Sequence, residues 1–379
     1  MKFLSIAAIL AGVAATPMAA LAQNGPGVTD KEIKIGNTMP YSGPASGYSA
    51  QGRVQSAYYD MINAKGGVNG RKIELLVGDD GYEPNKAVDE TLRMIEEKKV
   101  FSLFGYVGTP TANAVLPIVK EMDVPLVGAF TGAMTLRQPV TKQVFNVRAS
   151  YDDEAEALVA HFLAHGAKTV AVFYQDDGFG LAVLSGTEKA LQKRSMQVAA
   201  KGTFQRNTLA VQGGLAAMLA AKPDAVVMVG PYAPLASFIK EARAAGLKSQ
   251  LATVSFVGTE NLVAEVGKAG DGVLISQVVP FPADSDLALT RECREMVKAY
   301  SGQELGFVNF EGCITAKVMV AALERAGKDV SREALVGALR GMQGVDLGGM
   351  RVGFAADNHQ ASSAVFLTQI RDGQISKLR

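Results

Sequence analysis

Residues 100–137 read VFSLFGYVGTPTANAVLPIVKEMDVPLVGAFTGAMTLR, a stretch that predicts strand, turn, helix, strand and turn. Val100–Phe104 is a short apolar run of the kind found in buried parallel strands. Gly105–Pro110 interrupt this run, Ala112–Glu121 carry apolar residues at helical spacing, and Val124–Val127 form a second apolar run. We therefore expect an α/β fold built on a parallel sheet.

Each of the two predicted strands ends in a turn of small residues with a hydroxyl group, Thr109 in the first and Thr131 in the second. The carboxyl ends of neighbouring parallel strands lie at the same edge of a sheet, where such folds bind ligands. Backbone N–H groups at helix N-termini suit a carboxylate, as do Thr hydroxyls. The turns could instead only cap their helices, but two of them in succession favour a carboxylate-binding site.

The rest of the chain repeats the alternation of strands and helices in two series. The first series runs from Glu32 to Ala149, and the second, after a change near Ser150, runs from Thr169 to Val254. Long helical patterns after Pro282 suggest that the chain returns to the first lobe. We expect two α/β lobes with a ligand cleft between them. The expected boundaries are 28–149 with 279–349 for the first lobe, and 150–278 with 350–379 for the second.

The N-terminus has the parts of a secretory signal peptide. Lys2 supplies the positive charge, Phe3–Val13 the apolar core and Ala20–Ala22 the cleavage site. We therefore expect residues 1–22 to be removed on export and the mature protein to be soluble in the periplasm. The chain has 38 basic and 37 acidic residues without charge blocks, which disfavours nucleic acid and anionic membranes as partners.

The chain has two cysteines, Cys293 and Cys313, in two helical patterns joined by a short turn. Export permits a disulfide between them, and two buried thiols are the alternative. Two cysteines and three scattered histidines offer no metal-ligand spacing, so we expect neither a metal nor a cofactor. The histidines are His161, His165 and His359.

Three segments carry a resemblance to a known family: INAKGGVNGRKIELLVGDDGYEPNKAV, FGYVGTPTANAVLPI and IKEARAAGLK, in this order and spacing. The chain resembles the periplasmic leucine/isoleucine/valine-binding proteins, the type I solute-binding components of ABC importers. The resemblance implies two Rossmann-like lobes joined by a three-crossover hinge that close on a ligand. It also implies a small-molecule ligand, permease subunits as partners and a binding role without enzymatic activity. We expect a monomer.

The resemblance also implies binding residues. Amino-acid binders of this family hold the ligand carboxylate on the first lobe, at positions that match Thr109, the backbone of Ala129, and Thr131. Tyr48 matches a position that flanks the ligand, and Phe179 matches one that closes over it. Tyr232 matches a position that meets the ligand's amino end, and Phe307 matches one that lines its side-chain pocket.

One position departs from the amino-acid binders. They place an acidic residue against the substrate ammonium, where this chain has Ser255, and Glu260 is displaced by five residues. An unpaired buried ammonium costs roughly several kcal/mol, most of the about 8 kcal/mol of a micromolar affinity. We therefore expect a carboxylic acid without an α-ammonium group, aromatic or aliphatic because Phe130, Phe179 and Phe256 are near the cleft. An amino acid, with its counter-charge from Glu260 or a mobile loop, is the alternative, and amides are a further one.

Two other classes of function compete with transport. A sensor module of the same fold is one, although an exported chain without a membrane segment favours transport. An exported enzyme is the other, but the sequence has no Gly-x-Ser-x-Gly motif and no metal cluster. The pairs Asp79–Asp80 and Asp176–Asp177 fit loop acids or helix N-terminal charges better than a catalytic pair.

Overall fold

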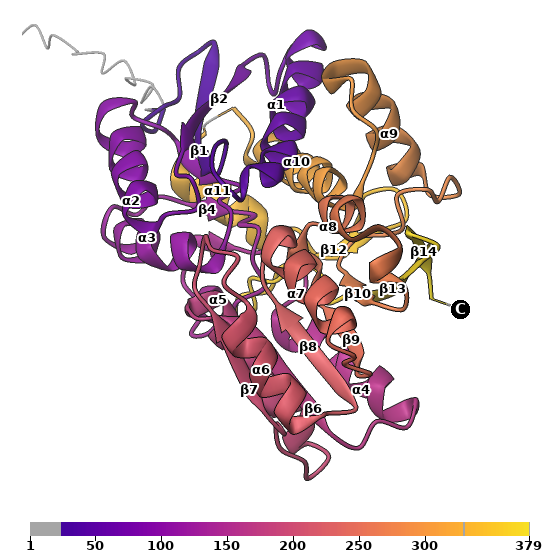
Figure 1. The fold of residues 1–379 in the computed structure, drawn as a ribbon. Helices are drawn as coiled ribbons and strands as arrows, with labels where there is room; N and C mark the ends of the chain where they lie inside the picture. The colour runs from indigo at the N-terminus through magenta and orange to yellow at the C-terminus, as the bar shows by residue number, and fades with distance from the viewer. Residues whose placement is uncertain (1–23, 329, 379) are drawn as a thin grey trace, which may run out of the picture.

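The computed structural model describes residues 24–328 and 330–378, and it has two α/β lobes (Figure 1). The first lobe is built on a five-stranded sheet of order β2-β1-β3-β4-β5, in which every neighbouring pair is parallel. The chain has the predicted strand–helix alternation here, so the turns after β3 and β4 lie at one edge of the sheet. The strands are β1 (Glu32–Met39), β2 (Lys72–Asp79), β3 (Ser102–Phe104), β4 (Leu126–Val127) and β5 (Val144–Phe145).

The second lobe is built on a seven-stranded sheet of order β14-β13-β10-β9-β8-β6-β7. Its central strands are parallel, and β13 and β14 extend one edge antiparallel. The strands are β6 (Val170–Gln175), β7 (Lys201–Phe204), β8 (Ala225–Val229), β9 (Gln250–Thr253), β10 (Leu274–Gln277), β13 (Phe366–Arg371) and β14 (Gln374–Lys377). Val144 and Val170 therefore belong to different sheets, as the change near Ser150 predicted.

Helices cover both sheets. In the first lobe these are α1 (Ser49–Ala64), α2 (Pro84–Leu92), α3 (Thr109–Glu121), α9 (Ala288–Ser301), α10 (Phe307–Ala326) and α11 (Arg332–Arg340). In the second they are α4 (Tyr151–Ala164), α5 (Gly178–Gln192), α6 (Gln212–Ala221), α7 (Tyr232–Ala244) and α8 (Thr259–Val266). Figure 1 shows α9 and α10 beside α1, so the chain does return to the first lobe.

Three further predictions from the sequence concern the disulfide, a membrane span and the signal peptide. A disulfide joins Cys293 of α9 to Cys313 of α10, with their Cα atoms 6.0 Å apart. No helix among residues 24–328 and 330–378 is long and apolar enough to cross a membrane. The signal peptide predicted for residues 1–22 lies outside the described residues.

The segment from Met350 to Ala361 bears on where the chain makes its third crossing between the lobes. The hairpin of β11 (Val345–Asp346) and β12 (Arg351–Val352) is followed by Phe354, which packs edge-on against Phe145 of β5. His359 stacks on the same ring at 4.1 Å. Residues 350–361 thus cover the end of the first sheet, and their apolar side chains join the first core, which favours a boundary after residue 361 over the one expected at 350. We propose 28–149 with 279–361 for the first lobe and 150–278 with 362–379 for the second.

Candidate functional site

The two Thr-bearing turns meet at the carboxyl ends of β3 and β4. Thr109 and Thr131 are fully buried, and their Oγ1 atoms lie 2.7 Å apart. The Thr131 N–H donates to the Ala129 carbonyl at 2.9 Å. Gly108 precedes α3 with a φ of +99°, and a Cβ there would lie 2.4 Å from the Tyr82 ring, so this position requires glycine. The structure therefore brings together the three residues expected to hold a carboxylate.

Six aromatic rings from both lobes surround these turns, and we call them the aromatic cluster. Phe256 is at its centre, with ring centroids 4.6 Å from Phe179, 4.9 Å from Tyr48 and 5.2 Å from Phe130. Tyr151 packs on Phe179 at 5.3 Å. The cluster consists of Tyr48, Tyr82 and Phe130 of the first lobe and Tyr151, Phe179 and Phe256 of the second. A ligand held at the turns would therefore have apolar ring surfaces around it.

Hydrogen bonds also join the lobes at this edge. The Tyr48 hydroxyl donates to the Phe256 carbonyl at 2.6 Å, and the Tyr232 hydroxyl donates to the Pro44 carbonyl at 2.9 Å. The Gly47 N–H in turn donates to the Tyr232 hydroxyl at 3.0 Å. These contacts hold the lobes together, and a ligand must separate them to enter.

Three polar groups of the site were not predicted from the sequence. The Tyr82 and Tyr151 hydroxyls and the Gln175 Oε1 are buried without a hydrogen-bond partner among the described residues. Burial raises the pKa of Tyr151 to about 12, so its hydroxyl is a neutral donor. Tyr82 lies just after β2, Gln175 is the last residue of β6, and Tyr151 lies at the first crossing between the lobes. These positions at the ligand-binding edge of the sheets are the signal that could have identified the three residues.

Beneath the cluster lies a buried group of charges, Arg148, Glu154 and Glu311, which we call the hinge triad. Arg148 Nη2 donates to Glu154 Oε1 at 2.9 Å, and Nη1 lies 3.5 Å from Glu311 Oε1. Arg148 Nη2 also donates to Ser255 Oγ. The second oxygen of Glu154 accepts from the Ser255 N–H at 2.8 Å and from the Ser276 hydroxyl at 2.6 Å. Ser255 therefore lies between the Arg148 guanidinium and the Glu154 carboxylate, and both oxygens of that carboxylate already accept hydrogen bonds.

Burial and pairing act in opposite directions within the triad. Burial lowers the pKa of Arg148, but the charges of Glu311 and Glu154 more than offset this, so the net shift is upward. Burial raises the pKa of Glu311 to about 7, even though Arg148 opposes the change. Arg148 therefore stays charged, and burial brings the pKa of the Glu311 carboxyl close to neutral pH.

Phe307, expected to line the side-chain pocket, lies outside the aromatic cluster. It packs against Phe281 at 5.6 Å, and its backbone N–H donates to Glu260 Oε1 at 2.6 Å. It borders a separate cavity of about 510 Å³ that also touches β13 and β14. Glu260 is the carboxylate that could have paired with a ligand ammonium in place of the acid missing at position 255. One of its oxygens instead accepts the hydrogen bond from the Phe307 N–H.

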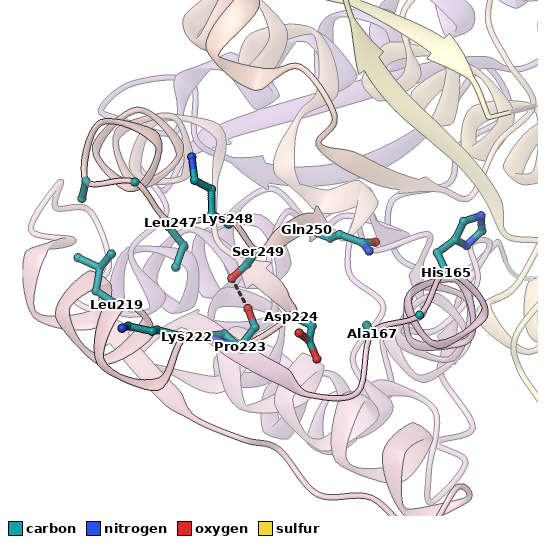
Figure 2. A pocket seen from close by; sticks show the side chains of 13 residues that line it. His165, Ala167, Leu219, Lys222, Pro223, Asp224, Leu247, Lys248, Ser249 and Gln250 are labelled. Carbon is teal, nitrogen blue, oxygen red and sulfur yellow. Dashed lines mark hydrogen bonds between the residues drawn. The ribbon is translucent and has the colours of Figure 1, made fainter.

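Figure 2 shows a larger cavity, of about 540 Å³, at the opposite end of the second sheet. Its lining includes Asp224 and Gln250, next to the amino ends of β8 and β9. Parallel sheets bind ligands at the other edge, and Asp224 already accepts hydrogen bonds from the Lys168 and Thr169 N–H groups. This cavity is therefore not the candidate site, despite its volume.

The fold agrees with comparisons to known proteins. Residues 32–374 match the family model described as periplasmic binding protein. The chain belongs to this family. A Leu/Ile/Val-binding protein homolog 7 from Brucella suis is 27% identical over 98% of this chain and 94% of its own. A possible leucine/isoleucine/valine-binding protein from Rhodopirellula baltica has a TM-score of 0.88 at 34% identity, over 92% and 97% of the two chains.

A third relative shows how widely the fold is used. A fatty acid ABC transporter substrate-binding protein from Thermomonospora curvata has a TM-score of 0.85 at 23% identity, over 94% of this chain and 93% of its own. At that identity the likeness concerns the fold alone. The solved structures confirm the type I fold predicted from the sequence. The family match confirms the predicted binding role, because this family consists of solute-binding proteins rather than enzymes.

Proposed function

We propose that this protein is exported to the periplasm and delivers a small carboxylic acid without an α-ammonium group to the permease subunits of an ABC importer. The ligand's carboxylate would bind the hydroxyls of Thr109 and Thr131 and the backbone at Ala129. Its apolar part would contact Tyr48 and Phe179, with Tyr232 closing the edge of the cleft. Phe307 remains only a proposal for longer ligands, because it lies outside the aromatic cluster.

The observation that carries this proposal is the hydrogen bond from Arg148 to Ser255 Oγ. At the position where amino-acid binders place an acid, this chain has a hydroxyl that faces a buried guanidinium. An ammonium at Ser255 would lie next to this guanidinium, and like charges a few ångströms apart in a buried site disfavour each other, while the carboxylates that pair with Arg148 are already engaged. The nearby carboxylates already have partners: Glu154 pairs with Arg148 and accepts hydrogen bonds from Ser255 and Ser276, Glu311 pairs with Arg148, and Glu260 accepts from the Phe307 N–H.

The second candidate is a carrier of branched-chain amino acids, which the names of the Brucella suis and Rhodopirellula baltica relatives favour. The fatty-acid name of the Thermomonospora curvata protein is in line with a ligand that lacks an amine. Sensing instead of transport is a third candidate. Permease and ATPase genes next to the gene of this protein would favour transport over sensing.

Calorimetric titration distinguishes the two ligand classes. The protein is first unfolded and refolded to remove copurified ligand, and it is then titrated with leucine, phenylalanine and their deamino analogues, 4-methylpentanoate and 3-phenylpropanoate. We expect at least one of the two acids to bind ten times more tightly than its amino acid, a difference of about 1.4 kcal/mol. Tighter binding of leucine or phenylalanine would contradict the proposal and support the amino-acid carrier.

Thr109→Val and Thr131→Val should each weaken binding of the preferred acid by roughly 1.5–3 kcal/mol, the range for hydrogen bonds to charged groups. Valine nearly preserves the shape of threonine but removes the hydroxyl. Thr187→Val is a matched control, because Thr187 is also buried but lies on α5 and bonds only the Val183 carbonyl. Unchanged affinity in both site variants, measured by calorimetry, would mean that the ligand does not lie on these turns.

Glu83→Gln should weaken ligand binding up to about fivefold, since exposed ion pairs contribute roughly 0.2–1 kcal/mol. Glu83 joins the lobes: its Oε2 accepts from Arg206 at 2.9 Å and its Oε1 from Asn207 at 2.6 Å. The loss should shrink as salt screens the Arg206 contact. Glu90→Gln is the control, because Glu90 pairs with Arg93 within the first lobe. Equal effects of the two substitutions on affinity would exclude a role in lobe closure.

A further inference from the structure

We propose that Arg148 donates a hydrogen bond to a second oxygen of the ligand, and that the preferred ligands are therefore 2-oxo acids. The inference rests on the proposed function, because it assumes a carboxylate at the Thr109 and Thr131 turns. It goes further by specifying which group the ligand carries on the carbon next to that carboxylate. In an amino acid this carbon carries the ammonium, and in a 2-oxo acid it carries a neutral acceptor.

The position of Arg148 fits this role. Its Cζ lies 5.0 Å from the ring centroid of Phe130, the residue before Thr131, and 5.7 Å from that of Tyr151. Arg137 ties the Arg148 backbone to the same turn, since its Nη1 donates to the Thr131 carbonyl at 3.2 Å and its Nη2 to the Arg148 carbonyl at 3.1 Å. Arg148 is thus held at the border of the aromatic cluster, between the carboxylate turn and Ser255.

A count of donors shows that Arg148 has unused hydrogen-bonding capacity. Its side chain is 1% exposed, its Nε has no hydrogen-bond partner among residues 24–328 and 330–378, and its Nη1 has only the 3.5 Å ion pair with Glu311 Oε1. Buried donors without an acceptor are costly, and for charged groups the cost is higher. The Tyr151 hydroxyl is likewise buried without a hydrogen-bond partner among these residues, and the Tyr151 ring faces the same guanidinium. This part of the site is therefore rich in donors and suits an acceptor on the ligand.

The charge of the triad decides between a neutral and an anionic acceptor. Two carboxylates, Glu154 and Glu311, already face the single guanidinium. A third carboxylate, as in a dicarboxylic acid, would add like charge in a buried site, which is unfavourable. A 2-oxo group accepts hydrogen bonds without adding charge. The observations therefore favour a 2-oxo acid over a dicarboxylic acid.

The test uses matched ligands and the unaltered, refolded protein. Phenylpyruvate and 4-methyl-2-oxopentanoate are compared by calorimetry with 3-phenylpropanoate and 4-methylpentanoate, which lack only the oxo oxygen. We expect at least one oxo acid to bind ten to a hundred times more tightly than its partner. Equal binding within both pairs, or tighter binding of the acids without the oxo group, would overturn this inference and leave the proposed function intact. Preference for the amino acids, or no binding by any of these compounds, would overturn both.

Two variants test whether Arg148 is the donor. Arg148→Lys keeps the charge but loses the guanidinium geometry, and it should reduce the affinity ratio of oxo acid to matched acid toward one. Tyr151→Phe removes the other donor of this part of the site and should reduce the ratio less than Arg148→Lys does. A preserved ratio in Arg148→Lys, or its loss only in Tyr151→Phe, would overturn the assignment to Arg148. The comparison on the unaltered protein decides the ligand class even where Arg148→Lys does not fold.

Discussion

Arg148→Met is expected to lower the free energy of unfolding by about 3–5 kcal/mol, the range for removing one partner of a buried ion pair. Methionine fills much of the volume of arginine, so the effect is mainly electrostatic. Without the guanidinium, Glu154 and Glu311 are left buried without a cation, and Glu154 loses one of its hydrogen bonds. Urea denaturation of wild type and variant at pH 8 measures the difference.

The double variant Arg148→Met, Glu311→Gln is the matched control for this prediction. It retains one buried carboxylate, Glu154, whose Oε2 still accepts hydrogen bonds from Ser255 and Ser276. It should therefore be more stable than Arg148→Met alone. A loss of less than about 1 kcal/mol in the single variant, with no recovery in the double variant, would contradict the idea that the triad is held together by charge.

The carboxylate turns could be predicted from the sequence because local signals and chain order determine them. The apolar runs now seen as β3 and β4 are consecutive in a strand–helix–strand unit, and such strands become parallel neighbours. Their following turns must then meet, as Thr109 and Thr131 do at 2.7 Å. The return of the chain to the first lobe was predicted for a similar reason, since long amphipathic helices after Pro282 need an apolar surface to cover.

The hinge triad could not be predicted, because no local pattern links its members. Arg148 and Ser255 are 107 positions apart and come from different lobes. The sequence showed only that Ser255 stands where amino-acid binders have an acidic residue. Nothing in it indicated that the Arg148 guanidinium donates a hydrogen bond to the Ser255 hydroxyl. Similarly, Phe307 was placed in the ligand pocket by resemblance, but the start of α10 turns toward Glu260 instead. The later end that we propose for the first lobe had no signal in the sequence, because the β11–β12 hairpin carries little apolar periodicity.

Glu311→Gln is expected to stabilise the protein at pH 8 by about 3 kcal/mol, with no effect near pH 4. Burial raises the pKa of Glu311 from its ordinary value of 4.5 to about 7 in the folded protein. Between these values the folded state binds more protons than the unfolded state, so stability falls as the pH rises from about 4.5 through 7. Above pH 7 the ionised carboxylate imposes its full cost, which is about 3 kcal/mol for a shift of this size.

Glutamine removes this cost and leaves Arg148 paired with Glu154, so the variant should lack the part of the pH dependence that Glu311 causes. Asp80, whose pKa burial raises to about 6, contributes pH dependence to both proteins, and the difference between them therefore isolates Glu311. Glu324→Gln, at an exposed position of the same helix, controls for the loss of one carboxylate. Urea denaturation at pH 4, 6 and 8 provides the measurement. A constant difference between wild type and Glu311→Gln at all three pH values would contradict the raised pKa of Glu311, because a carboxyl that ionises normally contributes equally to both states across this range.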